Sequence, residues 1–80
     1  MSDTRLANYL RDLGTLLRED ALAVKKARDA TSDPLSRQFQ SGRLMAYNEV
    51  ISTIQNQASA FGLEKADVGL QGIDPDRDLT

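Results

Sequence analysis

The sequence has no cysteine, no histidine and no tryptophan among its 80 residues. Without cysteine there is no disulfide framework, no thiolate nucleophile and no zinc site built on sulfur ligands. Without histidine, the commonest metal ligand and the commonest general base at neutral pH are missing as well. We therefore expect a protein that is not an enzyme and that binds no metal ion and no cofactor.

The remaining motifs give no support for catalysis. The carboxylates alternate with arginines along predicted helices, a pattern typical of a solvated face. The phosphate-binding patterns GxGxxG and GxxxxGK[ST] are absent. The alternating acids Asp74, Asp76 and Asp78 are spaced like the opening of a calcium-binding loop, but the sixth position, which requires glycine, holds Leu79. A solvated acidic segment is the expected interpretation.

The charge is small and unevenly distributed. The chain carries 12 acidic and 10 basic residues; residues 1–62 hold eight basic and seven acidic residues, whereas residues 63–80 hold two and five. A nearly neutral body is not typical of a dedicated binder of nucleic acid or anionic membranes. No apolar run approaches the length of a membrane span, and the first residues lack the pattern of a secretory leader. We expect a cytoplasmic protein without a membrane partner.

Hydrophobic periodicity predicts two long helices. Over residues 3–30 the apolar side chains recur every three or four positions, at Leu6, Tyr9, Leu10, Leu13, Leu16, Leu17, Ala21, Val24, Ala27 and Ala30. Asp33 can cap a following helix, and Pro34 suits its first turn, where the missing N–H costs nothing. A second helix is predicted over residues 34–61, and Gly62 follows where a left-handed C-cap residue is expected.

These two helices have similar lengths and a short connection, which favours an antiparallel hairpin over residues 1–62. Gly42 interrupts the second pattern, and the alternative is a break there. Residues 63–80 contain two glycines and a proline without a sustained period, and they are predicted to form a largely disordered acidic tail. Docking of its apolar residues along a groove is the alternative, and these residues are Leu63, Val68, Leu70 and Ile73.

The apolar arcs are too wide for an isolated hairpin. They span roughly 140° on the first helix and roughly 160° on the second, more than one partner helix covers. The predicted fold is therefore all-α: an antiparallel two-helix hairpin that dimerises into a four-helix bundle, with a flexible C-terminal tail. A higher oligomer, or a partner that supplies the missing helices, would cover the same strip. The predicted dimer or partner interface consists of Leu10, Leu13, Leu17, Leu44, Tyr47, Ile51, Ile54 and Phe61.

Two opposite charges lie on this apolar seam. With the turn near residue 32, residue i of the first helix faces roughly residue 64−i of the second, and this places Asp20 opposite Arg43. The pair is a candidate seam ion pair that fixes the register. The alternatives are a polar spot that contacts a ligand and two side chains that extend past the edge of the seam to water.

The sequence predicts a small non-enzymatic helical interaction or regulatory protein that acts as a homodimer on a protein partner. Residues 43–51 mix apolar, aromatic and polar groups, and they form either a packed layer or a partner-binding patch around Met45 and Tyr47. The alternative function is that of a nucleic-acid-associated regulator with a basic patch near the turn. That patch would consist of Lys25, Lys26, Arg28 and Arg37, although cations near a helix C-terminus also complement its dipole.

Overall fold

Asp33 and Pro34 separate the two long helices in a computed structural model that describes residues 4–80. Helix α1 spans Thr4–Ala30 and helix α2 spans Pro34–Ala60. The Asp33 carboxylate accepts a hydrogen bond of 3.0 Å from the Ser36 N–H, and Pro34 occupies the first turn. The predicted helices are confirmed to within a residue at the described ends, and the predicted start at residue 3 lies outside the described residues.

Helix α2 ends in the predicted glycine cap. Gly62 has φ 72°, in the left-handed region. Its N–H donates to the Ser59 carbonyl at 3.0 Å, and the Leu63 N–H donates to the Ala58 carbonyl at 2.8 Å. This pair of bonds defines a Schellman motif and satisfies carbonyl groups that the helix leaves free. Gly42 lies within the continuous helix, so the alternative of a break there is wrong.

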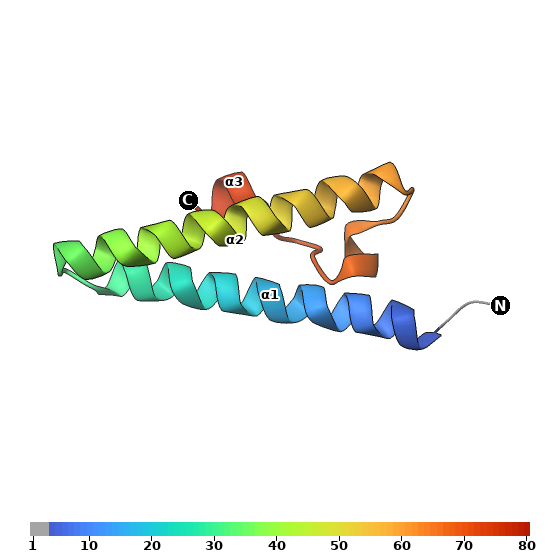
Figure 1. Ribbon diagram of the computed structural model, residues 1–80, viewed down its shortest axis with the longest axis horizontal. Coiled ribbons are helices and arrows are strands. Elements are labelled where there is room, and N and C mark those ends of the chain that lie inside the picture. Colours follow the sequence, from blue (N-terminus) through green and yellow to red (C-terminus); the bar gives the residue numbers. More distant parts are fainter. Residues whose placement is uncertain (1–3) are drawn as a thin grey trace.

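The two helices run antiparallel and form the predicted hairpin (Figure 1). A 3₁₀ helix, η1 (Lys65–Val68), contacts both long helices at the end of the hairpin far from the turn. A short helix, α3 (Pro75–Asp78), then packs against α2 nearer the middle. The chain therefore returns along one side of the hairpin.

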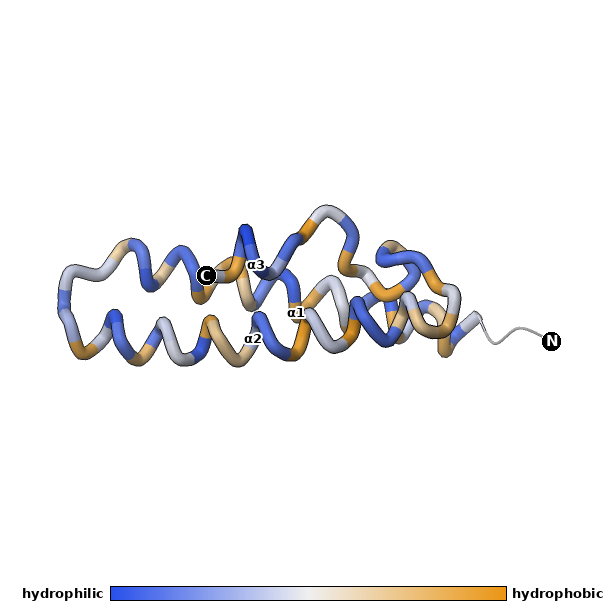
Figure 2. Tube along the Cα trace, turned by 90° about the horizontal axis from the view of Figure 1, so that it is seen from above, coloured by the Kyte–Doolittle hydropathy of each residue, from blue (hydrophilic) through white to orange (hydrophobic). Residues whose placement is uncertain are grey.

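The prediction of a flexible tail is wrong, because residues 63–80 form part of the hydrophobic core. Leu70 is fully buried and Leu79 is 1% exposed. Hydrophobic stretches recur along both long helices and in this C-terminal segment (Figure 2). They meet in one buried cluster that consists of Ala21, Val24, Leu44, Ile51, Ala58, Val68, Leu70, Ile73 and Leu79.

Local turn chemistry explains why this segment is ordered despite its acidic composition. The Glu64 and Asp67 side chains form a reciprocal capping box at the start of η1. Gly69 and Gly72 have φ of 72° and 76°, and each permits a sharp change of direction. Asp74 caps α3, accepting a hydrogen bond of 3.1 Å from the Asp76 N–H. Between and after these turns, four apolar side chains enter the core, namely Val68, Leu70, Ile73 and Leu79. Their burial supplies the driving force for ordering the segment.

Candidate functional site

The side of the hairpin that faces away from the C-terminal segment is the candidate interaction surface. Arg18 of α1 donates a hydrogen bond of 2.9 Å to the Gln71 carbonyl, and Asn48 of α2 donates one of 2.8 Å to the Pro75 carbonyl. Tyr9 precedes Arg18 by nine residues and Phe39 precedes Asn48 by nine. At 100° per residue, nine residues correspond to about half a rotation around the helix. Tyr9 and Phe39 therefore lie opposite the C-terminal segment.

We call this surface the open face. Its large side chains are strongly exposed: Tyr9 by 62%, Leu16 by 57%, Phe39 by 65% and Phe61 by 73%. Large apolar side chains that remain exposed on one face of a helical hairpin mark an interaction surface. The residues that define the open face are Leu6, Tyr9, Leu13 and Leu16 of α1 and Phe39, Val50 and Phe61 of α2.

A shallow groove of about 340 Å³ runs between the helices in the half of the open face near the turn. Ala23 and Ala27 leave it hollow because their side chains are short. Val24 and Tyr47 also line it, and Asp20 and Arg43 complete its wall.

The two seam charges thus line the same groove without forming an ion pair within the chain. The Arg43 guanidinium donates a hydrogen bond of 3.1 Å to the Gln40 side chain and lies 6.0 Å from the centre of the Phe39 ring. Within residues 4–80, the Asp20 carboxylate has neither a hydrogen bond nor an ion pair. The carboxylate is therefore available to a group outside the chain.

The residues predicted for the dimer interface differ in their burial. Leu44 and Ile51 are 1% and 0% exposed and belong to the core that includes the C-terminal segment, so placing them at an interface is wrong. They are buried together with residues of the ordered segment 63–80, for which the sequence predicts disorder. Leu17 is half-buried. The other predicted residues are exposed or pack partly exposed against the core, namely Leu10, Leu13, Phe61, Tyr47 and Ile54.

Two polar side chains of α2 hold the C-terminal segment, and neither role was predicted from the sequence. Gln55 is 7% exposed, and its side-chain amide donates to the Leu70 carbonyl at 3.1 Å and to the Ile73 carbonyl at 2.9 Å. Asn48 donates to the Pro75 carbonyl and, at 3.4 Å, to the Leu79 carbonyl. Both lie on one face of α2, seven residues apart. That spacing of two amide side chains beside an apolar seam is the signal that could have identified them.

Three of the four residues of the predicted basic patch bind main-chain carbonyl groups. Lys25 and Arg28 donate to the Thr80 carbonyl at 3.1 and 2.9 Å, and Arg37 donates to the Arg28 carbonyl at 3.3 Å. Arg28 also forms an ion pair of 3.0 Å with Asp29. Lys26 is exposed. The patch therefore contributes to anchoring the end of the described chain and to the turn.

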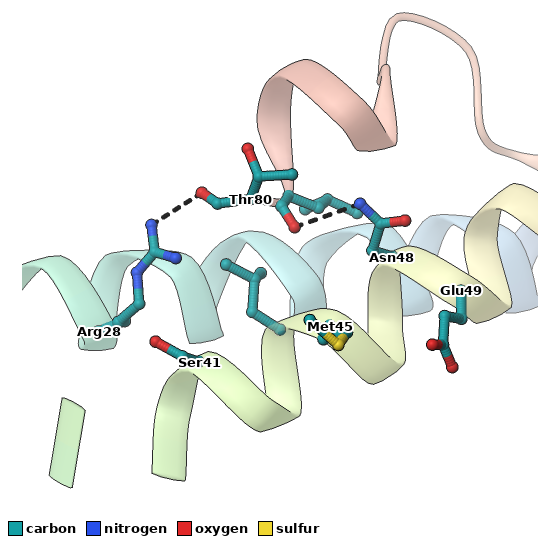
Figure 3. Close-up of a pocket in the computed structure, with 8 residues that line it drawn as sticks. Arg28, Ser41, Met45, Asn48, Glu49 and Thr80 are labelled. Carbon is teal, nitrogen blue, oxygen red and sulfur yellow. Dashed lines mark hydrogen bonds between the residues drawn. The ribbon is translucent and has the colours of Figure 1, made fainter. Parts of the chain in front are cut away.

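A second groove, of about 460 Å³, lies between α2 and the end of the C-terminal segment (Figure 3). Met45, which is 64% exposed, lines it together with the apolar side chains of Leu44 and Leu79. Arg28 and Asn48 reach from the long helices to the main chain at its edge. Tyr47 lines the groove on the open face instead, so Met45 and Tyr47 do not form one patch.

Charge interactions at α3 have a local effect. Arg77 and Asp78 form an ion pair of 2.7 Å. The hydrogen bond from Arg77, together with a second one from the Asp74 N–H, lowers the pKa of Asp78 to about 2. The contact with Asp78 in turn raises the pKa of Arg77. Both shifts stabilise the charged forms, so neither group is set up to transfer protons near neutral pH.

Across residues 4–80, no cluster of carboxylates is arranged to hold a metal ion. None of the helices in this range is both long and apolar enough to cross a lipid bilayer. No protein-family model, curated protein or solved structure matches the chain. The surfaces described above are therefore the basis for any functional interpretation.

Proposed function

We propose that this chain is a small non-enzymatic interaction or regulatory protein that acts as a homodimer on a protein partner. The observation that carries the proposal is the open face, on which large apolar side chains remain exposed although the opposite face of the hairpin is covered by the chain's own C-terminal segment. Two such faces packed together form a four-helix bundle, with a symmetric interface between identical surfaces.

The exposed side chains of the open face support self-association, because Tyr9, Phe39 and Phe61 are each more than 60% exposed and association would bury them. Burial of the open face would also supply apolar contacts that a chain without disulfide bonds otherwise lacks.

The groove lined by Met45 is the proposed site for the protein partner. It lies on the side of the C-terminal segment, so a dimer formed through the open face leaves it accessible. Its floor is apolar, Met45 provides an adaptable side chain, and Glu49 provides a charge at the edge. A predominantly apolar peptide segment with a basic residue would complement this composition.

The alternative of a nucleic-acid-associated regulator has less support. Lys25 and Arg28 are engaged by the Thr80 carbonyl, and Asp29 neutralises part of the local positive potential. Binding of mixed duplex or single-stranded DNA at low salt, with a steep loss of affinity as salt rises, would favour this alternative over a protein partner.

Surface substitutions test the two parts of the proposal separately. Leu16→Glu places a charge on the open face, whereas Leu22→Glu places the same charge at an exposed leucine of the same helix outside that face. We expect only Leu16→Glu to convert the dimer to a monomer of unchanged helical content, as measured by light scattering and circular dichroism. Equal oligomeric states for the two variants would contradict the assignment of the open face.

The partner site has its own test. A protein captured from the native host by the wild-type chain should be lost with Met45→Glu and retained with Gln38→Glu, an exposed position on the same helix. Loss with both variants, or retention with both, would contradict the groove as the partner site.

A further inference from the structure

The open face is complementary to itself in shape. On its exposed side, the groove is bounded by the short side chains of Ala23 and Ala27 of α1, whereas Phe39 of α2, which does not line the groove, has a 65% exposed ring. The antiparallel register places Phe39 opposite residue 25 or so, between these two alanines. A hollow on one helix and a large aromatic ring on the other thus occur at the same position along the hairpin.

At this position along the hairpin, the open face is also complementary to itself in charge. Asp20 and Arg43 face the groove from different helices, and the register places Arg43 opposite residue 21 or so. The carboxylate of Asp20 is unpaired within the described chain. Arg43 donates a single hydrogen bond, to Gln40, and keeps further N–H groups for a second acceptor.

Only one of the two face-to-face symmetries brings these features together. A two-fold axis parallel to the helices places α1 on the partner's α2 at equal levels, which sets Asp20 near the partner's Arg43 and the alanine hollow under the partner's Phe39. A two-fold axis across the middle of the hairpin places α1 on the partner's α1. The turn end of each α1 then faces the far end of the other. That arrangement brings Ala27 to the partner's Tyr9 and separates the two charges.

We propose that the dimer has its two-fold axis parallel to the helices, that the partner's Phe39 fills the groove between Ala23 and Ala27, and that Asp20 forms an ion pair with the partner's Arg43. This inference rests on the proposed self-association and specifies its geometry. Because the symmetry repeats each contact, the interface contains two aromatic insertions and two ion pairs. The pairs fix the register, since a shift by one helical turn would bury unpaired charges.

Charge reversal distinguishes a pair between chains from a pair within one chain. Asp20→Arg and Arg43→Asp should each weaken the homodimer by about tenfold in Kd, because each places like charges together across the interface. An equimolar mixture of the two variants should form heterodimers with close to wild-type affinity, as measured by native mass spectrometry. The absence of preferential heterodimers would overturn the proposed pairing.

Cysteine cross-linking tests the symmetry, and the chain offers no native cysteine as background. A mixture of Ala27→Cys and Phe39→Cys chains should form a disulfide between chains, whereas a mixture of Ala27→Cys and Tyr9→Cys should not. The reverse result would establish the transverse axis and overturn the proposed arrangement, while leaving self-association intact. A wild-type chain that remains monomeric would instead overturn both proposals.

Discussion

Gly14 and Gly69 pack against each other where the C-terminal segment crosses α1, and neither position has room for a β-carbon. A β-carbon at Gly14 would overlap the Val68 carbonyl, and one at Gly69 would overlap the Arg11 carbonyl. Gly69 also has φ 72°, a conformation that other residues rarely adopt. This close approach lets η1 sit directly on the backbone of α1 and bring Val68 and Leu70 into the core.

Gly14→Ala should separate η1 from α1 and destabilise the fold. We expect a loss of about 1–3 kcal/mol in the free energy of unfolding, the usual range for overpacking at a closely packed site. Urea unfolding followed by circular dichroism measures this change. Gly42→Ala is the matched control, because Gly42 lies within a helix and has nothing within 4 Å of the added carbon. There we expect a gain of about 0.5–1 kcal/mol.

Equal effects at the two glycines would contradict the packing of η1 on α1. A stabilising Gly14→Ala substitution would show that helix propensity outweighs this contact and that residues 65–69 do not lie on the helix.

Gln55→Met should loosen the C-terminal segment while keeping the volume of the side chain. The substitution removes the donor of two hydrogen bonds and leaves the Leu70 and Ile73 carbonyls unsatisfied in a buried site. An unsatisfied buried group costs about 1–3 kcal/mol. Gln38→Met, at an exposed position of the same helix, should change stability by less than about 0.5 kcal/mol.

Hydrogen exchange locates the effect of Gln55→Met. Amide protection should fall first in residues 68–79 and to a smaller degree in α1 and α2. Uniform loss of protection across the chain would contradict a local clamping role for Gln55.

The sequence allowed the hairpin to be predicted because each of its signals is local. The 3–4 spacing of apolar residues, the Asp33–Pro34 start and the Gly62 end all act within one or two helical turns. The order of residues 63–80 depends instead on distant contacts, such as that between Gly14 and Gly69 and those that Gln55 and Asn48 make. The composition of residues 63–80 indicates a polar segment that contains glycine. It does not indicate that side chains of α2 donate hydrogen bonds to the carbonyl groups of this segment.

The same distinction explains the outcome for the interface residues. The helical arcs include both the side that meets the C-terminal segment and the side that remains open, and periodicity alone does not separate them. The prediction that Leu44 and Ile51 lie at an interface depends on a disordered C-terminal segment, whereas this segment is ordered and packs with both residues in the core. Asp20 and Arg43 were placed on one seam by the register, and they do line one groove.

Asp78 should make the attachment of α3 sensitive to acid. Its pKa is about 2 in the folded chain and 3.8 normally. A carboxyl group with a lowered folded-state pKa stabilises the fold above its unfolded pKa, and this contribution disappears as the pH falls through the folded value. We expect amide protection in residues 74–79 to fall between about pH 4 and pH 2. The change should be modest because the ion pair is partly exposed to solvent.

Asp78→Asn should show weaker protection of α3 at pH 5 and lose this acid dependence, as measured by hydrogen exchange at several pH values. Asp76→Asn is the control, because the Asp76 carboxylate makes no hydrogen bond within residues 4–80, and this variant should retain the wild-type profile. A wild-type profile for Asp78→Asn would contradict the role assigned to the carboxylate.

The thermal stability of the chain should depend on its concentration. Association stabilises the folded state by mass action, so a dimer melts at a higher temperature as the concentration rises. We expect the Tm to rise by several degrees between about 1 and 100 μM protein and the rise to vanish in Leu16→Glu. A Tm that is independent of concentration in the wild-type chain would contradict coupling between folding and association.

Sedimentation equilibrium of the wild-type chain at micromolar concentration tests the central claim most directly, because the open face is proposed to be an interface between two copies. The account predicts a mass of about twice the chain's 8.8 kDa. A single species of 8.8 kDa with full helical content at these concentrations would contradict it.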